Sequence, residues 1–247
     1  MLSCEHASAA VPRDLAPLFR DARALLATHR GWDAGALAVS RSLARRLDVP
    51  LVAGRSTRLI VDLNRSAHNR SIFSEFTRDL PRAERAALIA RFHAPHWARA
   101  GRMVDAASAP VVHVAVHSFT PKLHGQVRPL ELGILYDPRR SRERAFADAL
   151  HAAIARRAPH LRIRRNRPYH GRSDGLPTAF RKARPARDYL GLELELNQAT
   201  LQSARDEREW AALLAPSLEE ALEAMAAPAQ SATGRAKSRA RRSAAKR

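Results

Sequence analysis

Residues 109–121 read APVVHVAVHSFTP, and this stretch decides the fold class. Val111 to Val116 form an apolar, β-branched run between two prolines, which is typical of a buried β-strand. His117 and Ser118 follow at its carboxyl end. Similar short runs predict further strands at residues 1–8, 49–54, 57–65, 130–138 and 189–198, and another opens the segment 161–177, which continues as a long polar loop.

Helical periodicity fills the intervals between these strands. Apolar residues recur at helical spacing along residues 13–30, 33–48, 80–107, 141–159 and 206–227. We expect the third of these helices to be interrupted near Pro95 and the fourth to be capped by Ser141. Strands that alternate with helices predict an α/β fold with a mixed, mostly parallel sheet and helices on both of its faces.

The length of 247 residues suits one large α/β domain or two small ones. After about Ala227 the sequence becomes a low-complexity run of small and basic residues. We therefore predict a single domain at residues 1–228 and a disordered basic tail at residues 229–247.

The formal net charge is +19, and seven of the basic residues lie in residues 230–247, which contain no acid. A basic surface favours anionic partners, so a nucleic-acid-binding protein is one alternative. However, aromatic residues make up only 5% of the chain and do not interleave with the basic ones, as stacking on bases would require. The tail is expected to add at most weak, non-specific contact with anions or nucleic acid.

Cysteine usage and hydropathy point to the cytoplasm. Cys4 is the one cysteine, so no internal disulfide can form, which fits a reducing compartment. The sequence has no pattern of a signal peptide and no apolar run long enough for a membrane span. We expect a cytoplasmic protein without a membrane partner.

The carboxyl ends of the predicted strands are unusually polar. The first ends in Glu5-His6, another in residues 62–65 (DLNR), the 109–121 strand in His117-Ser118, and the last carries residues 193–198 (ELELNQ). Functional residues of open α/β sheets gather at these ends, so we expect one shared cleft.

A metal centre is one reading of this cleft. A catalytic zinc takes three protein ligands from histidine and carboxylate side chains and leaves a position open. His6 and His117 lie at strand ends, and Asp33 starts a predicted helix. The alternative is that the histidines are only hydrogen-bonded and that Asp33 is a helix cap.

Two acids on the last strand are candidates for the general base. Glu193 and Glu195 alternate with leucines, so both face the same side of the strand. A hydrolase needs a carboxylate that takes a proton from water and passes it to the leaving nitrogen. The alternative is an edge strand with one solvated face.

An anion site is the third expectation. Arg58 precedes the run 59–63, and Asn64 and Arg65 follow it. Arginine binds a carboxylate through a two-pronged fork that lysine does not offer. Ordinary surface arginine is the alternative in a chain this basic.

Taken together, these segments resemble the N-formylglutamate amidohydrolase family. The matching pieces, in the order of the family, are CEHASAAVP, HRGWDAGA, STRLIVDLNRS, AVHSFTP, LGILYDP, NRPYHGRSDGLPTAF and GLELELNQ, and they span roughly Ser3 to Gln198. The resemblance implies a zinc-carboxypeptidase-like (phosphorylase/hydrolase-like) fold, one Zn²⁺ per chain, and hydrolysis of the amide of an N-acylated amino acid such as N-formylglutamate.

The resemblance also implies roles for individual residues. His6 and His117 would be metal ligands, with Asp33 or, failing that, Glu5 as the third. Asn64 and Arg65 would hold the α-carboxylate of the substrate, with Arg58 as a second cation. Glu195 is the expected general base and acid, Glu193 the alternative, and His96 is expected to be structural.

Two departures and one rival enzyme class complete these expectations. Only two residues precede Ser3, so the first strand is expected to be short or to begin upstream. The basic tail is not part of the family pattern. A zinc peptidase or a cell-wall amidase-like hydrolase is the alternative enzymatic function.

Overall fold

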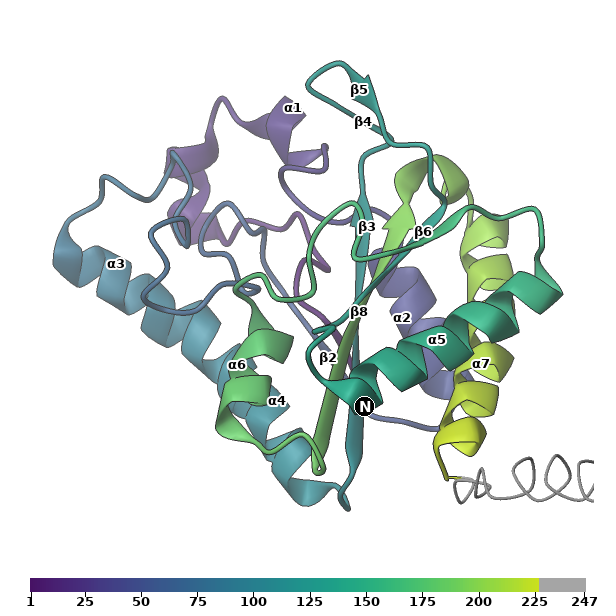
Figure 1. Ribbon diagram of the computed structural model, residues 1–247. Coiled ribbons are helices and arrows are strands. Elements are labelled where there is room, and N and C mark those ends of the chain that lie inside the picture. Colours follow the sequence, from purple (N-terminus) through teal and green to yellow (C-terminus); the bar gives the residue numbers. More distant parts are fainter. Residues whose placement is uncertain (227–247) are drawn as a thin grey trace, which may run out of the picture.

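The computed structural model describes residues 1–226, which build one six-stranded sheet between two layers of helices (Figure 1). The predicted tail at residues 229–247 lies outside this part of the chain. The strand order is β2 (Leu51–Ala53), β1 (Leu2–Cys4), β3 (Val111–Phe119), β8 (Tyr189–Asn197), β6 (Leu132–Leu135) and β7 (Ile163–Arg165). All neighbouring strands are parallel except β6 and β8, so the prediction of a mixed, mostly parallel sheet is confirmed.

The pair β3–β8 is the centre of the sheet. The two strands stay in register over nine residues, from Val111 opposite Tyr189 to Phe119 opposite Asn197. Every residue of β8 is buried, and β8 has a neighbour on each side. The alternative of a solvated edge strand for Glu193 and Glu195 is therefore wrong.

Strand alternation separates the apolar core from the polar residues. Val114, Val116 and the leucines of β8 point to one face, where α2 (Ala36–Arg46), α5 (Ser141–Arg157) and α7 (Ala204–Ala226) pack together. The odd-numbered positions of β3 and β8 point to the other face. The histidines of β3 and the glutamates of β8 therefore share one side of the sheet.

This second face is covered by α4 (Ala94–Ala106) and α6 (Leu176–Ala183), with α3 (Arg82–Leu88) further along the same ridge (Figure 1). Leu176 and Phe180 of α6 pack with Val111 and Tyr189 of the central strands. Between α3 and α4 lies a π-helical turn, Ile89–His93, just before Pro95. The predicted interruption of this long helical segment is thus present.

Residues 57–65 were expected to form a strand, and this prediction is wrong. The segment is a series of turns whose apolar side chains enter a second hydrophobic cluster beneath the loops, including Leu59, Ile60 and Val61. Side chains satisfy its backbone: Thr57 Oγ1 accepts from the Leu59 amide, and Asp62 Oδ1 accepts from the Asn64 amide. Buried apolar turns and buried strands look alike in sequence.

Two smaller expectations also differ from the structure, and one hairpin was not expected. Residues 13–30 do not form one helix, because a 3-10 helix (Arg13–Phe19) that contains Pro17 is followed by the short α1 (Arg23–Leu26). Arg140, not Ser141, stands at the N-cap of α5, and its side chain makes no capping bond. The hairpin of β4 (Lys122–Leu123) and β5 (Gln126–Val127) was not predicted.

Two further observations complete the description of the fold. Gln198–Thr200 forms a single 3-10 turn directly after β8. Within residues 1–226, none of the helices combines the length and apolar character that crossing a bilayer requires.

Candidate metal centre

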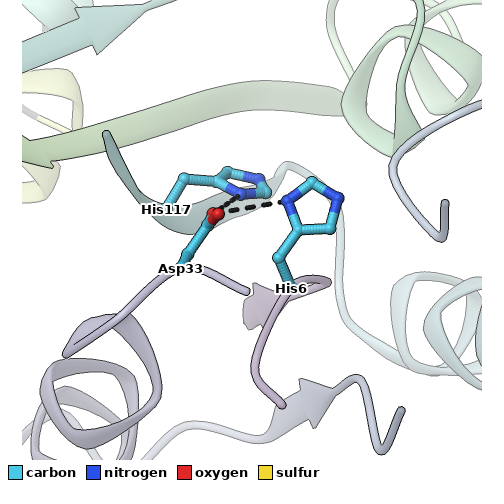
Figure 2. Close-up of side chains that lie close together, drawn as sticks. All are labelled: His6, Asp33 and His117. Carbon is cyan, nitrogen blue, oxygen red and sulfur yellow. Dashed lines mark hydrogen bonds and ion pairs between the residues drawn. The ribbon is translucent and has the colours of Figure 1, made fainter. Parts of the chain in front are cut away.

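Three elements deliver the candidate ligands to one point at the carboxyl end of the sheet. His6 lies two residues beyond β1, His117 is on β3, and Asp33 is in the turn before α2. The Asp33 amide donates to the His6 carbonyl at 2.9 Å, which joins that turn to the end of β1. Figure 2 shows the Asp33 carboxylate joined by dashed lines to both imidazole rings.

The distances between these side chains suit one small ion. Asp33 Oδ2 lies 2.8 Å from His117 Nδ1 and 3.3 Å from His6 Nδ1. One donor atom from each residue can be chosen so that all three lie within 4.8 Å of one another. All three residues are buried. Two imidazoles and one carboxylate are a donor set of catalytic zinc sites.

Each imidazole also turns its second nitrogen to a carboxylate. His6 Nε2 lies 2.7 Å from Asp62 Oδ1, and His117 Nε2 lies 2.9 Å from Glu5 Oε2. Histidines that bind metals usually have such an outer partner, which fixes the tautomer and orients the ring. Of the two candidates for the third ligand, Asp33 faces both Nδ1 atoms, whereas Glu5 lies behind His117.

The charge balance of the site also fits a cation. Only one arginine, Arg58, forms ion pairs with the acids of this cluster within residues 1–226. Buried charges are costly unless an opposite charge compensates them. The buried acids at the site are Glu5, Asp33, Asp62, Glu193 and Glu195.

Electrostatics keep the inner acids ionised. Burial alone would raise the pKa of the Glu5 carboxyl, but His117 holds it at about 2. Burial likewise opposes ionisation of Asp33 and Asp62, yet His6, His117 and Arg58 keep both carboxyl pKa values below their usual range. Burial would lower the pKa of His117, but the Asp33 and Glu5 carboxylates raise it well above the ordinary histidine value.

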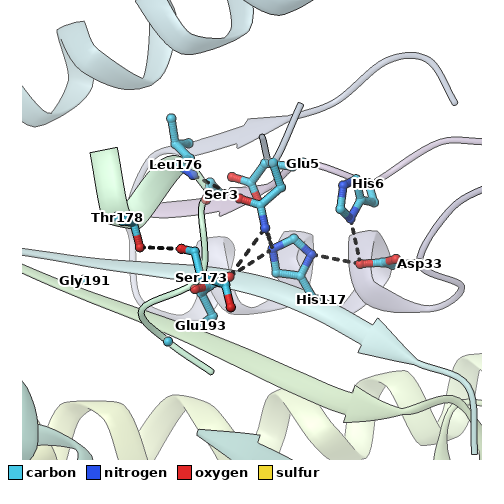
Figure 3. Close-up of polar contacts among 12 residues, drawn as sticks. Ser3, Glu5, His6, Asp33, His117, Ser173, Leu176, Thr178, Gly191 and Glu193 are labelled. Atoms are coloured by element: carbon cyan, nitrogen blue, oxygen red, sulfur yellow. Dashed lines mark hydrogen bonds and ion pairs between the residues drawn. The ribbon is translucent and has the colours of Figure 1, made fainter. Parts of the chain in front are cut away.

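Glu193 and Glu195 behave in the opposite way. Burial raises the pKa of Glu195 to about 8 and also raises that of Glu193. Glu195 stands opposite His117 in the β3–β8 register, and its Oε2 has no hydrogen-bond partner among the residues described. Glu193 Oε2 lies 3.4 Å from Asn64 Nδ2 and 4.0 Å from His117 Nε2. Figure 3 shows Glu5, Asp33 and Glu193 around the His117 ring.

The three predicted anion-binding residues lie at the same cleft, but each has different hydrogen-bond or ion-pair partners. Arg58 Nη2 lies 2.8 Å from Asp62 Oδ2, and Nη1 lies 3.6 Å from Asp33 Oδ1. Asn64 Oδ1 accepts from the Leu176 amide at 3.0 Å. Arg65 Nη1 donates to the Asp174 carbonyl at 2.8 Å, and no carboxylate within residues 1–226 forms an ion pair with Arg65.

A cavity of about 180 Å³ joins these groups. Its wall includes all the predicted site residues except Glu5, which lies behind His117. His96, expected to be structural, is buried on α4 and does not line this cavity. Ser118, named above at the polar end of its strand, also lines the cavity. Eight further lining residues were not predicted: His29, Phe119, Thr120, Leu135, Tyr169, His170, Ser173 and Asp174.

The missed residues had a weak sequence signal. Tyr169, His170, Ser173 and Asp174 come from the polar loop within residues 161–177, whose unusual length was visible. Asp62 was visible as a polar residue in the DLNR run, but its place behind His6 depends on the turns of residues 57–65.

The fold and the site define the class of this protein. It is an α/β protein with a mixed sheet that carries a candidate metal-binding cluster of histidine and carboxylate side chains at its carboxyl edge. The model of the N-formylglutamate amidohydrolase family matches residues 1–202. The chain belongs to this family and is therefore a hydrolase that acts on an amide bond.

Solved structures agree with this assignment. Gene product Atu2144 from Agrobacterium tumefaciens is 32% identical with a TM-score of 0.80, and the alignment covers 92% of this chain and 91% of that one. The N-formylglutamate amidohydrolase from Ralstonia eutropha JMP134 shares the fold at 17% identity and a TM-score of 0.64, with 90% and 94% of the two chains covered. The comparison with curated proteins gave no match.

Proposed function

We propose that this protein is a zinc-dependent amidohydrolase that removes the acyl group, of the formyl type, from an N-acylated amino acid such as N-formylglutamate. The observation that carries the proposal is the cluster of His6, Asp33 and His117, with a carboxylate behind each ring. These three side chains would hold the ion, and the N-formylglutamate amidohydrolase family supplies the reaction class.

A bound zinc ion would supply Lewis acidity, which polarises an acyl carbonyl and acidifies water. Glu195 is the group of this chain that handles the proton. Its Oε2, which has no hydrogen-bond partner among residues 1–226, accepts a proton from the attacking water and then donates that proton to the nitrogen of the cleaved amide. Burial raises the pKa of Glu195 above the ordinary value for glutamate, so its ionised form is a stronger base towards water. The products are the free acid and the free amino acid.

Arg65 is the cation that we assign to the α-carboxylate of the substrate. It lines the cavity and makes one bond to a backbone carbonyl, which leaves other guanidinium donors for a bound anion. Asn64 stands beside it and is held by the Leu176 amide. Arg58 is already paired with Asp62 and Asp33, so its part is to balance the charge of the cluster.

The size of the cavity favours a small substrate. About 180 Å³ is smaller than the roughly 300–1,000 Å³ of typical ligand pockets and suits an N-acyl amino acid better than a peptide or a cell-wall fragment. A zinc peptidase or cell-wall amidase-like hydrolase is therefore the second candidate.

A cytoplasmic location and weak contact of the tail with anions or nucleic acid remain predictions.

A metal analysis combined with a substrate panel tests the proposal. We expect one zinc per chain and hydrolysis of N-formyl amino acids in preference to N-acetyl or N-succinyl amino acids and short peptides. His6→Ala and His117→Ala are expected to lose both the zinc and the activity, whereas His160→Ala, at an exposed position, keeps both. Full deacylase activity in the two site variants would contradict the proposal.

A further inference from the structure

Arg128 follows the hairpin β4–β5, which projects from the carboxyl end of β3 (Figure 1). Its guanidinium lies over two aromatic rings, 5.1 Å from the centroid of Tyr169 and 5.8 Å from that of Phe119. Both rings line the cavity of the metal centre. Arg128 therefore stands at the rim of this cavity, although sequence analysis gave it no role.

Aromatic side chains, and not a carboxylate, hold the guanidinium of Arg128 in place. Its Nη1 donates to the Tyr169 hydroxyl at 3.1 Å, and within residues 1–226 it forms no ion pair. A guanidinium stacked on aromatic rings is already ordered, so it loses little freedom when it binds a carboxylate. Its remaining donors are available to an anion at the cavity mouth.

The positive charges of Arg128 and Arg58 both act on His29, a residue of the cavity wall. Burial lowers the pKa of His29, a lining residue, and the positive charges of Arg128 and Arg58 lower it further. Arg58 is paired with acids, whereas Arg65 on the cavity wall and Arg128 at its rim have no acidic partner among residues 1–226.

These two cations match a substrate with two carboxylates. We propose that Arg128, braced by Tyr169, binds the side-chain carboxylate of the substrate and thereby selects N-acyl derivatives of acidic amino acids over neutral ones. This inference rests on the proposed function, in which Arg65 takes the α-carboxylate. Arg128 acts on specificity and does not touch the reacting atoms.

The test compares N-formyl-L-glutamate with N-formyl-L-glutamine, two substrates of the same shape that differ in charge. We expect the wild-type kcat/KM to favour the glutamate derivative by at least about tenfold, and Arg128→Met to reduce this preference about 10- to 100-fold, mainly through KM. Arg128→Lys should fall between the two because lysine keeps the charge but not the fork or the stacking. Tyr169→Phe, which removes the hydroxyl, should weaken the preference less than Arg128→Met.

Arg102→Met, at an exposed arginine of α4, is the matched control and should leave both kcat/KM values unchanged. Equal wild-type kcat/KM values for the two substrates, or an unchanged preference in Arg128→Met, would overturn the role of Arg128 and leave the proposed deacylase intact. A chain that hydrolyses neither substrate would contradict the proposed function instead. In that case calorimetry compares the binding of L-glutamate with that of L-glutamine. If Arg128 has the proposed role, L-glutamate binds more tightly than L-glutamine, and Arg128→Met abolishes the difference.

Discussion

Asp62 Oδ1 lies 2.7 Å from His6 Nε2, on the side of the ring opposite the nitrogen that faces Asp33. The same carboxylate accepts from the Asn64 amide, and its other oxygen pairs with Arg58. Asp62 therefore fixes the orientation of a candidate ligand and connects it to the loop that carries the substrate-binding residues. Asp62 is a positioning residue of the candidate metal centre.

The first prediction concerns this outer carboxylate. Asp62→Asn should weaken zinc binding about 10- to 100-fold, because the amide no longer supplies the negative charge that raises the basicity of His6. Competition with a chromophoric chelator measures the zinc dissociation constant directly. Asp79→Asn, at an exposed acid paired only with its neighbour Arg78, is the control. Equal zinc affinities in all three proteins would contradict a positioning role for Asp62.

The second prediction separates the two glutamates of β8. Glu195→Gln should reduce kcat by roughly 10²- to 10⁴-fold while zinc content stays at one per chain, because the amide cannot accept a proton. Glu193→Gln should reduce kcat less, since Glu193 lies against Asn64 and His117. Kinetics on zinc-loaded proteins, with metal content measured on the same samples, checks both. A larger loss in Glu193→Gln would reverse the assignment.

The third prediction concerns a buried ion pair between Glu143 at the start of α5 and Arg181 of α6. Arg181 Nε donates to both oxygens of Glu143 at 3.0 Å, and Glu143 also accepts from the amides of Asp137 and Gly191. Removing one partner leaves an uncompensated buried charge, so Glu143→Ala should lower the free energy of unfolding by about 3–5 kcal/mol.

Urea denaturation measures this loss. Glu220→Ala is the matched control, because Glu220 pairs with Arg156 and Arg157 at the surface, where such pairs contribute about 0–1 kcal/mol. A change of less than about 1 kcal/mol in Glu143→Ala would show that Arg181 finds other compensation.

The central strands and most helices could be predicted from the sequence, because β3 is an apolar, β-branched run between two prolines, β8 alternates apolar and polar residues, and the helices carry regular apolar spacing. The same alternation indicated that Glu193 and Glu195 share a face. The turns of residues 57–65 could not be predicted, since Leu59, Ile60 and Val61 are as apolar as a strand. The contact between Asp62 and His6 depends on those turns, and Arg128 reaches Tyr169 only through a hairpin that the sequence did not reveal.

The last prediction concerns pH and His113, which is buried on β3. Its Nε2 lies 2.7 Å from Ser3 Oγ and its Nδ1 lies 2.7 Å from the Tyr189 hydroxyl, so the ring joins β1, β3 and β8. Burial lowers the pKa of His113 to about 3, against 6.5 as the ordinary value. Below pH 6.5 the unfolded chain therefore binds a proton here that the folded chain does not bind.

It follows that His113 destabilises the fold as the pH falls from 6.5 towards 3, by up to about 1.4 kcal/mol per pH unit. His113→Gln removes this titration and keeps groups that can bond to Ser3 and Tyr189. Urea denaturation of chelator-treated proteins at pH 7.5, 6.5 and 5.5 should show the free energy of unfolding of the wild type declining relative to that of the variant below pH 6.5. The other titrating groups are common to both proteins, so their contributions cancel in the difference. A difference that stays constant from pH 7.5 to 5.5 would mean that His113 accepts its proton inside the fold.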